Sequence, residues 1–336
     1  MSLQIQKIII SIVTLFLFLS GNLIGVNHFD TEKDYRAAVA SLDFFENTTE
    51  TAIGQVQIHD IIADHLNSEL PDGKTEKKVI VIGYDGCRLD TLSLMKNQEG
   101  GGIQTLLADG GKAVISYCGG VNYPQINTQD TSTAPGWCSM LTGQWADVHG
   151  IKKNYVPKSN DHLTMLTTLV EDGTIDSSAF YVSWDGHFNE SDCTYWNEKS
   201  YAAEKGLNVN FVDAGDDNGT YTNVVTDLGK TDCSDFIFSI FEYCDHEGHT
   251  TGFGPKNKRY ANKFNDVQKT ADEIISAVKA RPTYETEDWL IIITADHGGF
   301  DLTHGSMTIQ ERYTFIVANK DFNYKPEAQA DAEPLC

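Results

Sequence analysis

The chain has 336 residues, of which 40% are hydrophobic and 10% aromatic, and this composition is typical of a globular protein rather than a disordered one. Its length suits one large α/β domain or at most two domains. The formal net charge of −23 argues against duplex nucleic acid as a partner, because such binding requires a basic surface. The same acidity repels anionic substrates, so phosphate chemistry would require local cations such as bound metals.

Residues 1–26 have the pattern of an export signal. Lys7 precedes an apolar run over residues 8–19, and weaker apolar character continues to Val26 without a clean small-x-small cleavage site. We therefore expect a signal peptide or a membrane anchor in residues 1–26. The protein would be secreted, or anchored to the membrane with its catalytic domain outside the cytoplasm.

Residues 27–77 are polar and predict a helical N-terminal appendage. Amphipathic patterns indicate helices near 33–46 and 54–68, and a Pro-Asp-Gly-Lys-Thr linker at 71–75 follows them.

From residue 78 onward, short apolar runs alternate with helical patterns, which predicts an α/β fold with a mostly parallel central sheet flanked by helices. The expected strands are 78–84, 178–183, 236–241, 289–294 and 314–318. The expected helices are 89–97, 102–108, 134–142, 162–172 and 257–280. We assign the catalytic domain to 78–320 and a frayed tail to 321–336.

Seven cysteines occur without a C-x-x-C pair, which argues against a zinc ribbon: Cys87, Cys118, Cys138, Cys193, Cys233, Cys244 and Cys336. In an exported protein some of them are candidates for disulfides, with one left over, and the sequence does not give the connectivity. Cys138 and Cys244 adjoin the candidate site residues described next, where packing is the simpler explanation.

An aspartate follows each of three predicted strands: Asp85 after 78–84, Asp245 after 236–241 and Asp296 after 289–294. Because ligands of open α/β sheets bind beyond the carboxyl ends of the strands, these side chains are expected to converge on one crevice.

Histidines accompany two of these aspartates. His249 lies one helical turn after Asp245, and His297 directly follows Asp296. Carboxylates and neutral imidazoles are ordinary zinc ligands. His304 lies nearby in the sequence, although its local context is more typical of a loop histidine.

Thr133 precedes Pro135, a residue that suits the first turn of a helix, so Thr133 should lie near a helix N-terminus. The local sequence alone fits a plain capping threonine. A metal on its oxygen, together with the positive end of the helix, would make its hydroxyl a competent nucleophile.

The segment from Thr133 to Ile151 resembles the nucleophile segment of the alkaline phosphatase superfamily, and most closely its type I phosphodiesterase/nucleotide pyrophosphatase branch. That branch has the pattern T-x-P-N-x-x-S-x-x-T-G-x-x-P-x-x-H-G-I. The resemblance continues, in the order of the family, through Tyr84-Asp85-Gly86, Asp245-x-x-Gly-His249-x-x-Gly252 and Asp296-His297-Gly298, and covers about residues 78–320.

The resemblance implies a metal-dependent hydrolase of phosphoric esters that binds two divalent ions, usually zinc, although such ligands also accept manganese or iron. The first ion would be held by Asp245, His249 and His304. The second would be held by Asp85, Asp296, His297 and Thr133. Thr133 would also be the nucleophile, forming a covalent phospho-enzyme that water hydrolyses.

The chain departs from this pattern at Gly136, where the branch has an asparagine that donates to a phosphoryl oxygen. Loss of one such donor typically costs about 2.7–4 kcal/mol of transition-state stabilisation. The candidate replacements are the backbone N–H groups of Gly136 and Trp137 and the side chain of Asn154. His304 also follows His297 sooner than in the branch, a spacing that resembles phosphomutases and sulfatases.

The expected substrate is a small-molecule phosphodiester, either nucleotide-like or a headgroup diester. No arginine or lysine lies within ten residues of Thr133, which favours a diester over a monoester, although Arg88, Lys152 and Lys153 could reach the site in three dimensions. An aromatic-rich stretch either walls the substrate or packs internally: Trp184, His187, Tyr195, Trp196 and Tyr201.

Three alternative functions are carried forward. The same site would suit a phosphomonoesterase or a phosphonate hydrolase. A sulfatase requires a cysteine or serine nucleophile and an arginine where Trp137 stands, so it fits poorly. A non-catalytic metal- or phosphate-binding surface protein would be expected to have lost ligand residues, whereas all seven are present.

Overall fold

The computed structural model describes residues 31–98, 100–121, 129–155, 162–188 and 194–325. The expected signal peptide or anchor lies outside these ranges, as do Cys193, Cys336 and most of the expected tail. Within the described ranges, no helix is both long and apolar enough to cross a membrane.

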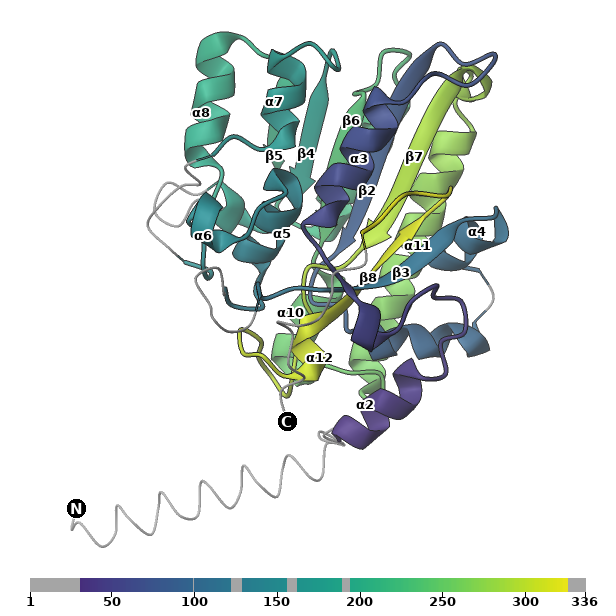
Figure 1. Cartoon of the computed structure of the whole chain (residues 1–336), viewed down its shortest axis with the longest axis vertical. Helices are drawn as coiled ribbons and strands as arrows, with labels where there is room; N and C mark the ends of the chain where they lie inside the picture. The colour runs from purple at the N-terminus through teal and green to yellow at the C-terminus, as the bar shows by residue number, and fades with distance from the viewer. Residues whose placement is uncertain (1–30, 99, 122–128, 156–161, 189–193, 326–336) are drawn as a thin grey trace, which may run out of the picture.

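An eight-stranded sheet forms the centre of the described structure (Figure 1). Its spatial order is β1 (Ile53–Gly54), β3 (Lys112–Tyr117), β8 (Tyr313–Ala318), β7 (Glu287–Thr294), β2 (Glu76–Tyr84), β6 (Phe236–Phe241), β4 (Ser178–Val182) and β5 (Val209–Asp213). Among these strands, β8 alone runs antiparallel to its neighbours, β3 and β7. The predicted mostly parallel α/β fold is therefore confirmed.

Strand β2 shows how the sequence builds two cores. Val79 and Val81 point into the core on one face of the sheet, and Ile80 and Ile82 point into the core on the other. Successive side chains of a strand alternate between faces, so a strand covered on both sides is apolar throughout. This explains the unbroken apolar run that predicted the strand.

Helices cover both faces of the sheet (Figure 1). One face carries α3 (Gln57–Asn67), α5 (Thr133–Thr142), α7 (Met165–Glu171) and α8 (Trp196–Lys205). The other carries α4 (Gly102–Ala108), α9 (Asp217–Leu228) and α11 (Lys258–Lys279). The shorter helical elements are α2 (Glu32–Val39), α6 (Ala146–His149), α10 (Tyr243–Thr251), α12 (Ile309–Arg312) and the 3-10 turns η1 (Thr49–Thr51), η2 (Leu89–Asn97), η3 (Asp185–His187) and η4 (Tyr284–Thr286).

The five predicted strands are present, each with ends within two residues of those expected, whereas β1, β3 and β5 were not predicted. The segment 89–97 forms a 3-10 helix. The two N-terminal helices are shorter than predicted. A capping box on Thr31 starts α2, which ends at Val39, and residues 53–54 belong to β1 rather than to α3.

Residues 31–77 pack into the domain rather than lying outside it as an appendage. Strand β1 pairs with β3, and α3 contacts both β2 and α5. The Gln55 side-chain amide donates to the Gly136 carbonyl at 3.2 Å. On α2, the ring centre of the buried Tyr35 lies 5.6 Å from the Arg88 guanidinium. The segment thus supports elements that carry the candidate site.

Candidate active site

The three aspartates at strand ends meet at one edge of the sheet. Asp85 follows β2, Asp296 follows β7 and Asp245 lies in the first turn of α10, directly after β6. These strands are neighbours, and Gly86 brings their ends into contact. Gly86 has φ +64°, and a Cβ there would lie 2.6 Å from Asp245 Oδ1. The crevice predicted from the strand ends is therefore present.

A first group of candidate metal ligands consists of Asp85, Asp296 and His297. One side-chain donor atom of each lies within 4.8 Å of the others, and all three side chains are fully buried. The Thr133 hydroxyl lies 3.4 Å from Asp85 Oδ1 and 3.4 Å from His297 Nε2. The structure thus brings the candidate nucleophile to the residues expected to share its metal.

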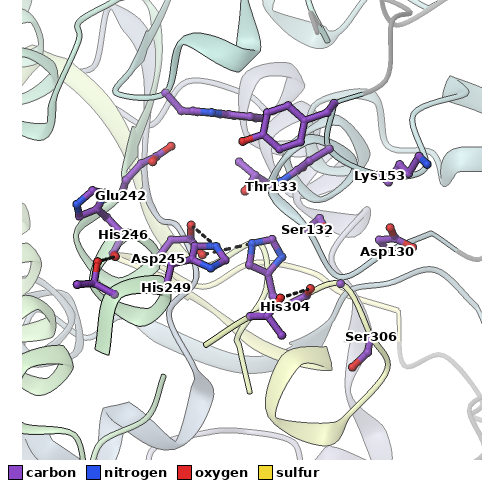
Figure 2. A pocket seen from close by; sticks show the side chains of 16 residues that line it. Asp130, Ser132, Thr133, Lys153, Glu242, Asp245, His246, His249, His304 and Ser306 are labelled. Atoms are coloured by element: carbon purple, nitrogen blue, oxygen red, sulfur yellow. Dashed lines mark hydrogen bonds and ion pairs between the residues drawn. The ribbon is translucent and has the colours of Figure 1, made fainter. Parts of the chain in front are cut away.

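A second group of the same size consists of Asp245, His304 and His297. His304 Nε2 lies 3.6 Å from Asp245 Oδ1, and His249 Nε2 lies 3.3 Å from Asp245 Oδ2 (Figure 2). The rings of His297 and His304 are in contact, tilted by 32° with 4.1 Å between their centres. His297 therefore adjoins both groups, whereas His249, which was expected in the second, joins it only through Asp245.

All three histidines have the same orientation. The Nδ1 atoms of His249, His297 and His304 lie 2.9, 2.7 and 3.1 Å from the carbonyl oxygens of Leu302, Gly298 and Thr131. Because a carbonyl only accepts hydrogen bonds, each Nδ1 carries the proton. Each Nε2 therefore faces the aspartates, and this arrangement is typical of metal-binding histidines.

The buried carboxylates are poorly compensated by the protein itself. Burial, together with a neighbouring carboxylate, raises the pKa of Asp85 and of Asp296 well above the usual range. Burial lowers the pKa of His297 to about 3, so this imidazole is neutral. The Asp245 hydrogen bond raises the pKa of His249 to about 9.

Two carboxylate oxygens bear directly on whether metals fit here. Asp245 Oδ1 and Asp296 Oδ2 are buried and have no hydrogen-bond partner among the described residues. A buried carboxylate is stable only when it is paired or coordinates a metal. Unused carboxylate oxygens beside neutral imidazole nitrogens form the donor set that zinc and similar divalent ions prefer. The residues present therefore fit the binding of divalent metal ions.

Thr133 begins helix α5, with Ser132 as its N-cap. The next N–H group, on Ala134, donates to Asn154 Oδ1 at 2.8 Å. Asn154 therefore fixes the loop over the start of the helix, and its Nδ2 is the donor left for a ligand.

The other two candidate phosphoryl donors are less suited. The Gly136 N–H donates within the helix to the Ser132 carbonyl at 2.9 Å. The Trp137 backbone N–H lies inside helix α5, and the buried indole N–H of the same residue donates to Asp85 Oδ2 at 2.9 Å, so the indole orients a candidate metal ligand. Of the three residues proposed from the sequence, Asn154 alone lines the cavity.

A cavity of about 770 Å³ lies over the site (Figure 2). Its lining residues include Thr133 and Asn154, the ligand candidates Asp245, His249 and His304, and a set not expected from the sequence: Asp130, Ser132, Tyr155, Glu242, His246, Thr250, Thr303, Gly305 and Ser306. Glu242 directly follows β6, so the strand-end rule could have identified it. Burial, with Asp85 and Asp245 nearby, raises its pKa well above the usual range.

The cationic side chains named from the sequence differ in whether they reach the cavity. Lys153 lines the cavity, on the side away from Glu242 (Figure 2). Arg88 is buried and forms two hydrogen bonds with Asp90, at 2.9 and 2.7 Å. Arg88 is therefore a structural residue and does not line the cavity.

The residues of the aromatic stretch also differ in whether they reach the cavity. Trp184 lines the cavity, with its ring edge-on to Tyr155 at 5.7 Å. His187 and Tyr195 are buried behind it, and Tyr201 donates a hydrogen bond to Glu171. The substrate-wall interpretation thus fits Trp184, whereas packing explains His187 and Tyr195.

Two further residues of the nucleophile segment, Ser139 and His149, stabilise helix α5 through buried hydrogen bonds. Ser139 Oγ lies 3.0 Å from His149 Nε2, and Gln129 donates to Ser139 Oγ at 2.8 Å and to the Pro135 carbonyl at 3.0 Å. These buried side chains give the serine and histidine of the nucleophile segment a structural role.

Sequence and structure comparisons relate the chain to known proteins. The sequence profile described as type I phosphodiesterase / nucleotide pyrophosphatase matches residues 79–314, whereas no curated protein sequence matches the chain. Similar solved structures include an inactive murine ectonucleotide pyrophosphatase / phosphodiesterase 5 in complex with AMP (18% identity, 66% of this chain and 57% of that one, TM-score 0.45). Others are the phosphonate monoester hydrolase of Agrobacterium radiobacter (12%, 72% and 68%, 0.47) and the periplasmic domain of phosphoethanolamine transferase EptC from Campylobacter jejuni (13%, 73% and 80%, 0.46).

The chain thus spans less than two thirds of the murine protein's length. Because the family profile covers most of the chain, the chain belongs to the type I phosphodiesterase/nucleotide pyrophosphatase family, a family of phosphoric ester hydrolases.

Proposed function

We propose that this protein is a phosphodiesterase that uses Thr133 as its nucleophile. The observation that carries the proposal is the position of the Thr133 hydroxyl. It lies 3.4 Å from both Asp85 Oδ1 and His297 Nε2, at the start of α5, and it borders the cavity. A hydroxyl placed between a carboxylate and an imidazole, at the positive end of a helix, is poised to attack an electrophilic phosphorus.

Two divalent ions, which we propose to be zinc, would stabilise the negative charge on the attacking and leaving oxygens. Asp85, Asp296, His297 and Thr133 would hold one ion, and Asp245, His249 and His304 the other. The export signal pattern of residues 1–26 leads us to propose that the protein acts outside the cytoplasm.

The residues of the chain itself perform three tasks. Thr133 Oγ forms a bond to phosphorus as the ester bond to the leaving alcohol breaks, and Asp85 Oδ1, at 3.4 Å, accepts the hydroxyl hydrogen bond beforehand. Asn154 Nδ2 donates to a phosphoryl oxygen in place of the asparagine that Gly136 replaces. Water then cleaves the phosphothreonine and restores the Thr133 hydroxyl.

The charges around the cavity favour a diester. Lys153 is the sole lysine or arginine among the described residues that line it, whereas Asp130 and Glu242 also line it. A phosphomonoester carries a second negative charge near these acidic side chains, and Lys153 is the one cationic side chain of the described lining that could pair with it. A diester carries one negative charge.

One wall of the cavity favours a cationic group on that diester. Trp184 and Tyr155 present aromatic surface, and Glu242 places an acidic side chain in the same cavity. Aromatic faces beside a carboxylate are the chemistry that binds ammonium groups. We therefore place a diester with an ammonium headgroup ahead of a nucleotide, whose base could stack on the same rings.

The test uses the zinc-loaded full chain with bis-p-nitrophenyl phosphate and p-nitrophenyl phosphate. We expect preference for the diester, loss of at least about 100-fold in kcat for Thr133→Ala, and partial retention for Thr133→Ser. Metal content measured on each variant separates a lost nucleophile from a lost metal. Undiminished turnover by Thr133→Ala would refute the proposed nucleophile, and a clear monoester preference would refute the substrate class.

A further inference from the structure

Two cysteines outside the proposed mechanism occupy matching positions on neighbouring strands. In the parallel pair β2 and β6, Tyr84 is the register partner of Phe241. Cys87 lies three residues beyond Tyr84, and Cys244 lies three residues beyond Phe241. The two segments that follow these strands leave the sheet side by side, and the Asp85 N–H donates to the Phe241 carbonyl at 2.9 Å.

Beyond the strands, the two segments remain in backbone contact. A Cβ on Gly86 would lie 2.8 Å from the Asp245 Cα and 2.7 Å from its Cβ. Residues 86 and 245 therefore touch, and Cys87 and Cys244 each adjoin one of these two residues in the sequence. The Tyr260 hydroxyl fixes the first segment by donating to the Gly86 carbonyl at 2.6 Å.

Both thiols are buried. Cys87 and Cys244 are 0% and 1% exposed, and both are reduced in this structure. Burial raises the pKa of the Cys87 thiol, and the neighbouring Cys244 thiol raises it further. The Cα atoms of a disulfide usually lie about 4.4–6.8 Å apart, a separation that suits residues flanking a backbone contact.

We propose that Cys87 and Cys244 are a disulfide site that covalently ties the segment carrying Asp85 to the segment carrying Asp245. The oxidant is a low-molecular-weight disulfide, such as oxidised glutathione. One cysteine thiolate attacks it and releases one thiol, and the second thiolate then attacks the mixed disulfide and releases the other. Two electrons and two protons leave on the two thiols, and one Sγ–Sγ bond forms.

The position of the bond gives it a structural consequence. Asp85 belongs to one group of candidate metal ligands and Asp245 to the other. A bond between the neighbouring residues 87 and 244 fixes the separation of the two groups without using either ligand. Because both thiols are closed to solvent, exchange occurs during folding or local opening of the loops.

The test is disulfide mapping of the full chain after equilibration with oxidised and reduced glutathione, acid quench, unfolding and alkylation. Trypsin cuts after Lys78 and Arg88 and isolates Cys87. A glutamyl endopeptidase cuts after Glu242 and separates Cys244 from Cys233. We expect a peptide pair joining Cys87 to Cys244 that disappears on reduction. Alkylation of both cysteines at every glutathione ratio, or pairing with a different cysteine, would overturn the proposal.

A second readout compares stability. Reduction should lower the Tm of the wild-type chain by about 5 °C or more, since the bond closes a loop of more than a hundred residues. The same treatment should leave the Tm of Cys87→Ser unchanged. Cys118→Ser is the matched control, because Cys118 is also buried but its thiol donates to the Glu311 carbonyl at 3.3 Å. If Cys87→Ser does not fold, the wild-type map decides alone. Neither readout depends on hydrolysis, so failure of the proposed function would leave both intact.

Discussion

The indole N–H of Trp137 donates to Asp85 Oδ2 at 2.9 Å, while the Thr133 hydroxyl faces the other oxygen of the same carboxylate. Helix α5 therefore carries both the proposed nucleophile and the side chain that orients a proposed metal ligand. The ring fits because Gly83 has no side chain, since a Cβ there would lie 2.5 Å from the Trp137 ring. The position of Asp85 thus depends on a strand glycine and a helix tryptophan together.

Trp137→Phe tests this relationship. Phenylalanine keeps much of the buried ring but leaves Asp85 Oδ2 without its donor, and loss of such an orienting partner typically weakens metal binding about 10–100-fold. Competition with a chromophoric chelator would measure this loss. Trp145→Phe is the control, because the Trp145 ring stacks on Tyr117 at 5.8 Å instead of contacting a ligand. Equal metal affinity in the two variants would contradict the role given to Trp137.

Gly136→Ala should impair the site even though alanine normally favours a helix over glycine by about 0.5–1 kcal/mol. The new Cβ would lie 2.9 Å from the Asp296 Cβ and 3.2 Å from its carbonyl oxygen, so Asp296 would have to move. We expect weaker metal retention and slower hydrolysis, measured by metal analysis and by diester turnover.

The control for that variant is Gly229→Ala, in a helix end where an added Cβ comes no closer than 3.4 Å to its neighbours. If Gly136→Ala retained metals and activity as well as Gly229→Ala does, the close packing against Asp296 would be irrelevant to the site.

Metal removal should destabilise the protein as well as inactivate it. The buried Asp245 Oδ1 and Asp296 Oδ2, which have no hydrogen-bond partner in the described structure, would lose their compensating charge. Binding at 100 times Kd stabilises a folded state by about 2.7 kcal/mol, so a chelator should lower Tm by several degrees, and added zinc should restore it. Differential scanning fluorimetry would show this. If the chelator left the Tm of the metal-loaded protein unchanged, this result would count against the metal site.

The strand-end carboxylates were predictable because the central strands are buried on both faces and their sequences are continuously apolar. Asp85 and Asp296 stand where such runs stop, so the parallel sheet alone brings them together. Two of the three missed strands, β5 and β1, lack this signal, whereas β3 is buried over most of its length. β5 is an edge strand with exposed residues, and β1 has only two residues.

The finer arrangement of the site depends on distances that spacing does not encode. His297 adjoins both ligand groups because its ring lies against His304, and Trp137 reaches Asp85 from another element. The role of Asn154 likewise depends on a loop folding back over the start of α5. Sequence spacing named these residues as candidates without assigning their contacts.

Acid stability should depend on a buried ion pair away from the site. Arg281 Nη2 lies 2.6 Å from Glu287 Oε1, and Thr283 and Trp289 also donate to this carboxylate. Although burial opposes it, these hydrogen bonds lower the pKa of Glu287 to about 2. A lowered pKa in the folded state stabilises the protein above the unfolded pKa of about 4.3, and this stabilisation is lost as pH falls toward 2.

Glu287→Gln should therefore destabilise the protein by about 3–5 kcal/mol at neutral pH, because it leaves Arg281 buried without a charge partner. Urea unfolding at pH 7 and at pH 3 should show a smaller difference from wild type at the lower pH. Glu32→Gln is the control, since the Arg36–Glu32 pair is exposed and such pairs contribute about 1 kcal/mol or less. A pH-independent difference would show that Glu287 does not titrate with folding.

Glu242→Gln should change substrate preference without abolishing hydrolysis. Glu242 lies across the cavity from Lys153 (Figure 2). It precedes helix α10, whereas the proposed nucleophile, Thr133, begins helix α5. If its carboxylate attracts an ammonium group, the glutamine variant should lose about tenfold in kcat/KM, or 1.4 kcal/mol, toward p-nitrophenyl phosphorylcholine. Turnover of methyl p-nitrophenyl phosphate, a diester that lacks a cationic group, should change little. Asp130→Asn, which removes a carboxylate on the Lys153 side, should affect the two substrates equally. A parallel loss on both substrates for Glu242→Gln, or faster turnover of the p-nitrophenyl ester of thymidine monophosphate than of the choline ester by the wild type, would favour a nucleotide over an ammonium headgroup.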